Sequence, residues 1–173
     1  MYSVGDIFPD FDLPSCDADN NLGTTTIPDD DDRWSVFYFY PKDFTFICPT
    51  EIRDMDKLVD EDCNVLGFSG DNEFCKLNWK ENNDLIKNIR HTLVADTGLR
   101  LSTELGIVDE ENGVCFRATF IIDPEGVIQH TSCNALDTGR NVDEVIRTLH
   151  ALKSGGLTAC SWQVGDDFVG YIP

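Results

Sequence analysis

The stretch WSVFYFYPKDFTFICPTEI, residues 34–52, leads from an apolar segment through a short loop to a single cysteine. Residues 34–40 are mostly β-branched or aromatic, which is typical of a strand covered on both faces. Pro41 ends this run. A helix can begin at Cys48, because Pro49 suits a first helical position, where a missing N–H costs nothing. The stretch therefore predicts a strand, a loop and a helix that begins at a lone thiol.

The segments that follow alternate between helix and strand patterns. The first helix continues in an apolar stripe at helical spacing, made of Ile52, Met55, Leu58 and Val59. Further strands are predicted at 64–71 and 92–96, and further helices at 73–82 and 99–105.

The C-terminal part of the chain carries the clearest hairpin and the clearest helix. Residues 117–133 contain two apolar runs joined by a Pro-Glu-Gly turn. In residues 141–156, Asn141 and Glu144 have capping-box spacing, and Gly155 is a natural stop. Together with the alternating elements before them, these patterns predict an α/β domain. Its mixed central sheet is flanked by helices, and its early strands run parallel.

Composition favours one compact domain. The chain has 173 residues, of which 41% are hydrophobic, and no repeat or linker suggests a second domain. The start of the chain lacks a basic segment followed by a long apolar run, so no secretory signal is expected. No stretch approaches the roughly 18 apolar residues of a membrane span. We therefore expect a single domain over residues 1–173 in a cytoplasmic protein.

The charge balance excludes two classes of partner. With 13 Lys and Arg against 32 Asp and Glu, the formal net charge is −19, which repels nucleic acids and anionic membranes. Part of the excess is a run from Asp29 to Asp32, which we expect to be a solvated loop. A divalent-cation site is the alternative there, although the run lacks the calcium-loop pattern. Such acidity would also suit a salt-rich cytoplasm.

The chain has seven cysteines and three histidines. The cysteine count is odd and the spacings are irregular, so a disulfide framework is not expected. His91, His130 and His150 are scattered without zinc-finger spacing, which argues against a structural zinc site. Most of the cysteines are predicted to be small buried hydrophobes.

Cys48 is the exception, because the start of a helix favours a thiolate. Unpaired amide groups and the positive end of the helix dipole both stabilise a negative sulfur there. Thr45 lies three residues earlier, where a loop can fold its hydroxyl over the thiolate. Arg117 opens a predicted strand, and open α/β sheets place their sites at strand ends. Pro41 would add an apolar, donor-free wall.

A supporting ion pair is predicted between Glu51 and Arg140, which precedes the last helix. From these residues alone, three alternatives stay open. Cys48 can be a buried residue with no chemistry. A cysteine phosphatase loop would need a CxxxxxR frame, but only four residues separate Cys48 from Arg53, and Glu51 would add negative charge to the phosphate cradle. A Cys–His hydrolase would need a histidine in a convincing context.

The sequence also resembles a known family. Pro41, Thr45 and Cys48 fit the PxxxTxxC motif of peroxiredoxins, and FYPKDFTFICPTE is similar to the branch of typical two-cysteine members and bacterial alkyl hydroperoxide reductase peroxidase subunits. The resemblance covers nearly the whole chain. It includes VGDIFPDF, LGFSGDNEF, RATFIIDPEGVI, GRNVDEVIR and ACSWQVGD.

The resemblance implies a thioredoxin-like fold and a thiol peroxidase that reduces hydrogen peroxide and organic hydroperoxides without a metal or organic cofactor. Cys48 corresponds to the peroxidatic cysteine, Thr45 and Arg117 to the groups that bind the peroxide, and Pro41 to the shielding residue. Glu51 and Arg140 match the supporting pair. Cys160, in a tail over residues 155–173, matches the resolving cysteine, which in this branch comes from the partner subunit.

The partners follow from the same resemblance. They are a hydroperoxide, a reductant (a thioredoxin-like protein or a dedicated flavoprotein), and further copies of the chain in homodimers or rings of dimers such as decamers. A peroxide sensor or a holdase-type chaperone with the same cysteine chemistry is the alternative function. The attacking thiolate becomes a sulfenic acid, and its helical turn must unwind before a second thiol condenses with it.

The sequence departs from the family pattern in two places. It has no GGLG-type loop before residues 92–96, and it ends in FVGYIP instead of a helix that contains YF. We therefore expect the first helical turn to unwind readily and overoxidation to be resisted. The cysteines outside the motifs are predicted to be structural and buried: Cys16, Cys63, Cys75, Cys115 and Cys133.

Overall fold

The structure, a computed structural model, describes residues 1–28 and 31–170. The chain divides into two compact units, which meet in the sequence at Arg140 and Asn141. None of the described helices is both long and apolar enough to cross a membrane.

The aspartate run lies partly outside this description. Asp29 and Asp30 are not among the described residues, so the predicted solvated loop stays a prediction there. Asp32 is exposed, in agreement with that prediction. Asp31 is half-buried, and its carboxylate accepts a 2.6 Å bond from Arg33.

The first unit is built on a seven-stranded mixed sheet with strand order β2-β1-β5-β4-β3-β8-β9. β3 pairs in parallel with β4, and β4 with β5, whereas the other neighbours are antiparallel. The mixed sheet and its parallel early strands confirm the α/β prediction. The strands are β1 (Phe11–Cys16), β2 (Leu22–Ile27), β3 (Trp34–Phe39), β4 (Cys63–Ser69), β5 (Thr92–Ala95), β8 (Arg117–Ile122) and β9 (Ile128–Asn134).

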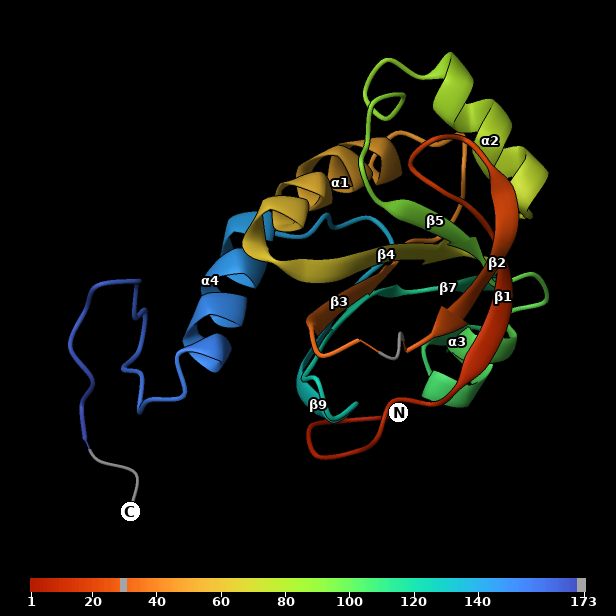
Figure 1. Ribbon diagram of the computed structural model, residues 1–173. Helices are drawn as coiled ribbons and strands as arrows, with labels where there is room; N and C mark the ends of the chain where they lie inside the picture. Colours follow the sequence, from red (N-terminus) through yellow and green to blue (C-terminus); the bar gives the residue numbers. More distant parts are fainter. Residues whose placement is uncertain (29–30, 171–173) are drawn as a thin grey trace. The chain divides into compact units, whose positions relative to one another are not determined.

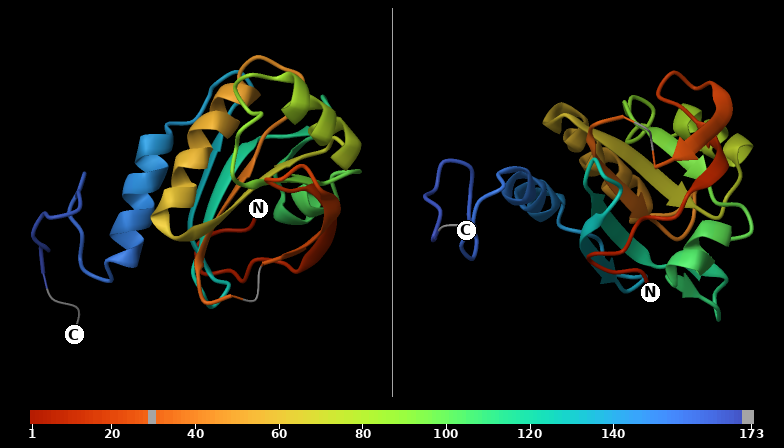
Figure 2. Two further views of the ribbon diagram at one scale, coloured as in Figure 1. Left: turned by 45° about the horizontal axis from the view of Figure 1, so that its top comes forward. Right: turned by 60° about the horizontal axis from the view of Figure 1, so that its bottom comes forward.

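Helices cover both faces of this sheet (Figure 1). α1 (Cys48–Met55) and α2 (Glu73–Asn82) lie on one side, and α3 (Arg100–Leu105) lies on the other. The further views in Figure 2 show the same arrangement of these three helices about the sheet. Covering on both sides is what the apolar stretch that became β3 requires.

β3 shows this by the alternation of its side chains. Phe37 belongs to the core cluster that also contains Leu101 of α3. Tyr38 points to the opposite face, because successive strand residues alternate. Tyr40, which follows the strand, packs on that same face against Trp79 of α2 at 6.2 Å between ring centroids. Complete burial of each large apolar side chain contributes about 1.5–3 kcal/mol.

The first helix is shorter than predicted. The α-helix ends at Met55, and the chain continues as the 3-10 helix η1 (Asp56–Glu61). The predicted apolar stripe survives this change because a 3-10 helix has three residues per turn, so Met55 and Leu58 share a face and both are fully buried. Val59, at the end of the stripe, is only half-buried.

The N-terminal hairpin of β1 and β2 was not predicted. Pro14 interrupts the first strand, and the second strand, LGTTTI, is largely exposed, so neither carries an apolar strand signal. A small two-stranded ribbon of β6 (Val108–Asp109) and β7 (Val114–Cys115) was also missed, since each strand has only two residues.

The second unit contains α4 (Val142–Lys153) and the residues that follow it. The predicted cap is formed, because the Asn141 side chain accepts a 3.2 Å bond from the amide of Glu144. The helix ends just before Gly155, whose φ of +67° belongs to the left-handed region. Residues 154–170 contain no helix, as the sequence predicted for the tail, whereas residues 171–173 of FVGYIP lie outside the described chain.

Candidate active site

Cys48 is the first residue of α1, and only 1% of it is exposed. Seven loop residues, 41–47, carry the chain from Tyr40 to this position. Ile47 before it makes no side-chain cap, and Pro49 follows it, as the sequence predicted. The sulfur therefore lies within the first turn, where helix amides lack partners and the dipole is positive.

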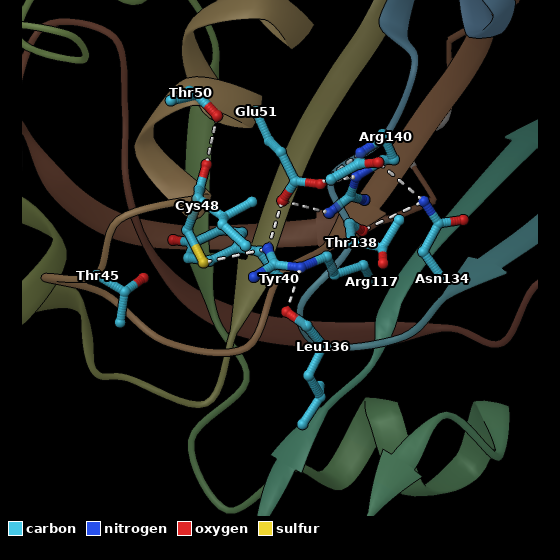
Figure 3. A network of polar contacts seen from close by, with 12 residues as sticks. Tyr40, Thr45, Cys48, Thr50, Glu51, Arg117, Asn134, Leu136, Thr138 and Arg140 are labelled. Atoms are coloured by element: carbon cyan, nitrogen blue, oxygen red, sulfur yellow. Dashed lines mark hydrogen bonds and ion pairs between the residues drawn. The ribbon is translucent and has the colours of Figure 1, made fainter.

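Arg117 brings a guanidinium to this sulfur from the first residue of β8 (Figure 3). Its Nη1 lies 3.3 Å from Cys48 Sγ and 2.6 Å from Glu51 Oε2. Its Nε donates to the backbone oxygen of Leu136 at 2.8 Å. Burial would lower the pKa of Arg117, but the bonds and charges of Cys48 and Glu51 outweigh it and raise that pKa. The side chain stays cationic.

Glu51 joins this guanidinium to a second one. Its Oε1 accepts bonds of 3.0 Å from both the amide and Nε of Arg140, and its Oε2 accepts a 3.1 Å bond from Arg140 Nη2. The three side chains, which we call the basic cluster (Glu51, Arg117 and Arg140), are between 2% and 4% exposed. Two guanidiniums against one carboxylate leave one buried positive charge beside the sulfur of Cys48.

Arg140 is itself fixed to the sheet. Its guanidinium donates to the carbonyl oxygens of Phe39 at 2.6 Å and Ala118 at 2.9 Å. It also lies over the ring of Tyr38, 5.3 Å from the centroid. Asn134 holds the loop that leads to Arg140, through a 3.1 Å bond to the oxygen of Gly139. These contacts keep the buried positive charge in place.

Thr45 lies near the sulfur, but its hydroxyl has another partner. It donates to the backbone oxygen of Lys42 at 2.9 Å, and the described structure contains no bond from Thr45 to Cys48. The hydroxyl that the sequence placed over the thiolate is therefore not on it in this conformation, because the loop turns it towards its own backbone.

A pocket of about 260 Å³ opens on this site. The four residues that the sequence assigned to peroxide chemistry all line it: Pro41, Thr45, Cys48 and Arg117. The remaining wall comes from Lys42, Phe46, Ile47 and Leu136. The structure thus brings together the four predicted residues, which lie up to 76 positions apart in the chain, from Pro41 to Arg117.

Cys160, the remaining predicted site residue, lies in the second unit. It is exposed and lines a pocket of about 540 Å³ with residues of α4, among them Arg147 and Ala151. All seven cysteines are free thiols in the structure. The pairing of Cys160 with Cys48 stays a prediction.

The other five cysteines were predicted to be buried, and for two of them this is wrong. Cys133 is exposed because it lies on the edge strand β9, and Cys75 is half-buried. Although Cys133 is exposed as a residue, partial burial of its thiol raises its pKa, and burial raises the pKa of Cys115 to about 12. Burial, followed by the charges of nearby Asp43, raises the pKa of Cys75 to about 11. These thiols are mostly protonated at neutral pH.

The geometry weakens two alternatives for Cys48. Arg53, which a phosphatase loop would need, points to Asp54 with a 2.8 Å bond and lies on the surface. Both ring nitrogens of His91 have hydrogen-bond partners, Tyr38 at 2.7 Å and Asp56 at 2.8 Å. His91 is therefore not available as the base of a Cys–His hydrolase. Among the described residues, one group of potential metal ligands lies close together: Asp43, Asp71 and Cys75.

Several contributors to the site were not predicted. The Leu136 carbonyl, the Tyr38 ring and the Asn134 amide all position the two arginines, but a backbone oxygen or a strand side chain has no sequence signature of such a role. The family resemblance predicted the charged residues of the site, but it did not predict the neighbouring residues that keep the two arginines in position.

Known proteins are similar to this chain along most of its length. Residues 4–131 match the AhpC/TSA family. The chain is 40% identical to alkyl hydroperoxide reductase C of Mycolicibacterium smegmatis, an alignment that covers 96% of this chain and 92% of the relative.

Solved structures agree with this likeness. Mycobacterium tuberculosis AhpC matches with a TM-score of 0.85 at 36% identity, and covers 94% of this chain and 99% of its own. The reduced 2-Cys peroxiredoxin of Plasmodium vivax matches with a TM-score of 0.87 at 32% identity, and covers 97% and 93%. The predicted thioredoxin-like fold is thereby confirmed. The chain belongs to the AhpC/TSA family of peroxiredoxins.

Proposed function

We propose that this protein is a thiol-dependent peroxidase that reduces hydrogen peroxide and organic hydroperoxides through Cys48. One observation carries the proposal. Cys48 Sγ lies 3.3 Å from the Arg117 guanidinium, in the first turn of a helix and on the wall of a pocket. The basic cluster has one surplus positive charge, so a thiolate makes the site neutral.

The first step is attack by the Cys48 thiolate on one oxygen of the hydroperoxide. A sulfur–oxygen bond forms and the O–O bond breaks, so the sulfur is oxidised to a sulfenic acid and the peroxide is reduced. The departing oxygen takes a proton from solvent and leaves as water or an alcohol. Arg117 stabilises the negative charge that moves from sulfur to oxygen, which is the kind of contact that acts most strongly in a transition state.

The pocket sets the substrate class. A volume of about 260 Å³ accepts hydrogen peroxide and leaves room for an organic substituent. The side chains of Phe46, Ile47 and Leu136 give the wall an apolar part that suits an alkyl chain. Thr45 lines the same pocket, and rotation of its hydroxyl away from Lys42 would let it bind the peroxide.

In the second step, Cys160 of the partner subunit attacks the sulfenic sulfur. A disulfide forms and water leaves, so atoms and electrons balance. Cys48 must leave its buried position for this, and the first turn of α1 must unwind. Ile47 provides no side-chain cap, and a good cap contributes about 1 kcal/mol, so this turn opens at lower cost than a capped one. A dithiol protein then reduces the disulfide.

The same weak helix start underlies resistance to overoxidation. A sulfenic acid that leaves the pocket quickly spends little time exposed to a second peroxide. We expect less sulfinic acid on Cys48 than in a peroxide-sensitive relative at the same peroxide dose during turnover, measured by mass spectrometry. Equal sulfinylation would contradict this expectation.

Peroxide consumption with a dithiol reductant tests the function. Cys48→Ser should abolish turnover, and Cys160→Ser should allow one oxidation and then stop. Cys133→Ser is the matched control, since Cys133 is exposed and has no proposed role. Non-reducing gels after peroxide should show a subunit-crossing disulfide only when both Cys48 and Cys160 are present. Turnover by Cys48→Ser would refute the proposal, and oxidation without turnover in the wild type would favour a sensor.

We also propose that residues 1–173 form one domain, with residues 155–173 as the tail that carries Cys160, and that the protein assembles at least as a homodimer. A cytoplasmic location agrees with seven free thiols, which a reducing compartment preserves. Sedimentation of the reduced protein tests the assembly, and a monomer at micromolar concentration would contradict it.

A further inference from the structure

Three potential metal ligands from separate segments lie close together at the loop that precedes Cys48. Asp43 lies in this loop, Asp71 follows β4, and Cys75 lies in the first turn of α2. One ligand atom of each lies within 4.8 Å of the others. The loop, the strand end and the helix therefore direct two carboxylates and a thiol to one point.

The carboxylate of Asp43 has an oxygen without a partner there. Its side chain is fully buried, and Oδ2 is one of the few buried polar side-chain atoms in the described residues that lack a hydrogen bond. A buried oxygen of this kind costs free energy unless something binds it. Oδ1, in contrast, receives Lys76 Nζ at 3.4 Å and the Ser69 hydroxyl at 3.0 Å.

Within the described part of the chain, all the hydrogen bonds of the Lys76 ammonium go to atoms other than Asp43 Oδ2. Its ammonium donates to Ser69 Oγ at 2.6 Å and to Tyr40 Oη at 3.1 Å, in addition to Asp43 Oδ1. It therefore does not satisfy Asp43 Oδ2. We call Asp43, Asp71 and Lys76 the acidic cluster, since two carboxylates face one ammonium.

Asp71 is held in a ligating position and can be reached. Its Oδ2 accepts the amide of Asp43 at 2.8 Å and the Ser69 hydroxyl at 3.2 Å, which ties the strand end to the loop. Asp71 also lines an open pocket of about 310 Å³ together with Pro41 and Gly98. This pocket makes Asp71 accessible from solvent.

We propose that Asp43, Asp71 and Cys75 bind one divalent cation of intermediate softness, such as Zn²⁺, with water as a further ligand. Two carboxylates and a thiolate carry three negative charges against the one positive charge of Lys76, so a dication makes the site neutral. A thiolate ligand favours Zn²⁺ or Co²⁺ over Mg²⁺ and Ca²⁺, which prefer oxygen alone. The bound ion would fasten the loop that supplies Pro41 and Thr45 to α2.

Cobalt titration of the reduced full-length chain tests this. Cys48→Ser and Cys160→Ser are introduced together, so that the thiols of the proposed peroxidase chemistry cannot bind the metal. Co²⁺ added without oxygen should bind with a stoichiometry of one and produce thiolate-to-cobalt absorption in the near ultraviolet. Zn²⁺ should displace it. Absence of this absorption at saturating cobalt would overturn the proposal.

Two substitutions in that background identify the ligands. Cys75→Ser should remove the thiolate absorption, and Asp71→Asn should weaken binding roughly tenfold or more. Cys133→Ser is the matched control and should leave both unchanged. Circular dichroism checks that each variant is folded, and the half-buried Cys75 and Asp71 make these milder changes than one at buried Asp43. Thiolate absorption that persists in Cys75→Ser, or unaltered affinity in Asp71→Asn, would refute this site.

Discussion

Two charge clusters, one buried and one partly buried, lie at the loop between β3 and α1, and each has a cysteine beside it. In the basic cluster, two guanidiniums outnumber one carboxylate next to Cys48. In the acidic cluster, two carboxylates outnumber one ammonium next to Cys75, whose pKa burial and these carboxylates raise to about 11. The two thiols are chemically alike in isolation. In the proposed chemistry, the opposite signs of the surplus charge beside the two sulfurs distinguish a nucleophile, Cys48, from a metal ligand, Cys75.

The largest effect is expected when the carboxylate of the basic cluster is removed, because the two clusters differ in how their charges are balanced. Glu51→Gln leaves two buried guanidiniums close together without their shared anion. We expect a loss of about 3–5 kcal/mol in the free energy of unfolding, as for other broken buried ion pairs. Urea denaturation measures it.

Glu144→Gln is the control for this change. Glu144 pairs with Arg147 at 2.7 Å, but its side chain is 55% exposed, so the expected loss is below about 1 kcal/mol. If Glu51→Gln and Glu144→Gln lost the same free energy of unfolding, the buried ion pairs of the basic cluster would be no more important for stability than an exposed pair.

The next largest effect is expected on the rate of peroxide reduction, when the positive charge of Arg117 beside the sulfur of Cys48 is removed. Arg117→Met keeps an unbranched, flexible side chain and deletes the donor 3.3 Å from Cys48 Sγ. The rate constant for peroxide reduction should fall roughly 10²–10³-fold, the usual effect of losing one donor that stabilises a transition state. Arg53→Met, on the exposed side of the same helix, should leave the rate nearly unchanged. A similar fall in both variants would contradict the assignment of Arg117.

A smaller effect comes from a carboxylate outside both clusters. Burial opposes ionisation of Asp56, but hydrogen bonds from His91 and Arg90 outweigh it and lower its pKa from 3.8 to about 2. The stabilisation is therefore complete above about pH 4 and is lost as the pH falls towards 2. Because Asp56 is partly accessible to solvent, we expect it to amount to about 1 kcal/mol.

Urea denaturation at pH 6 and pH 3 measures this contribution, with Asp56→Asn compared at both values. The variant should lose less stability than the wild type on acidification. Asp60→Asn removes an exposed partner of the same Arg90 and should change the acid response little. Identical acid responses of wild type and Asp56→Asn would refute the assignment.

The sequence predicts most of the charged site, and the reason lies in the family motifs. Cys48, Glu51, Arg117 and Arg140 are named by motif and meet as expected. The direction of the Thr45 hydroxyl is not predictable in this way, because one loop rotation decides between Lys42 and the sulfur. Contacts made by backbone oxygens cannot be predicted from the sequence either, because every residue has the same carbonyl group.

The same distinction applies to the fold, where elements with a clear sequence pattern were predicted and elements without one were missed. Strands with apolar runs and helices with clear ends were predicted, whereas the hairpin of β1 and β2 was not, since Pro14 and three exposed or half-buried threonines hide its pattern. The ligand group of Asp43, Asp71 and Cys75 was also missed. Its members lie on three segments, and only the order of β3 and β4 in the sheet brings them together.

The attachment of Arg140 to the carbonyl oxygens of Phe39 and Ala118 has a consequence for repeated cycles. These acceptors lie at the end of one central strand and near the start of its neighbour, so the counter-charge is held by the sheet, whereas the sulfur belongs to a helix whose first turn is proposed to open and close. In the proposed cycle, the turn that refolds after each reduction returns to a positive charge that the sheet has kept in place. Reassembly of a competent centre then needs only the refolding of one short segment.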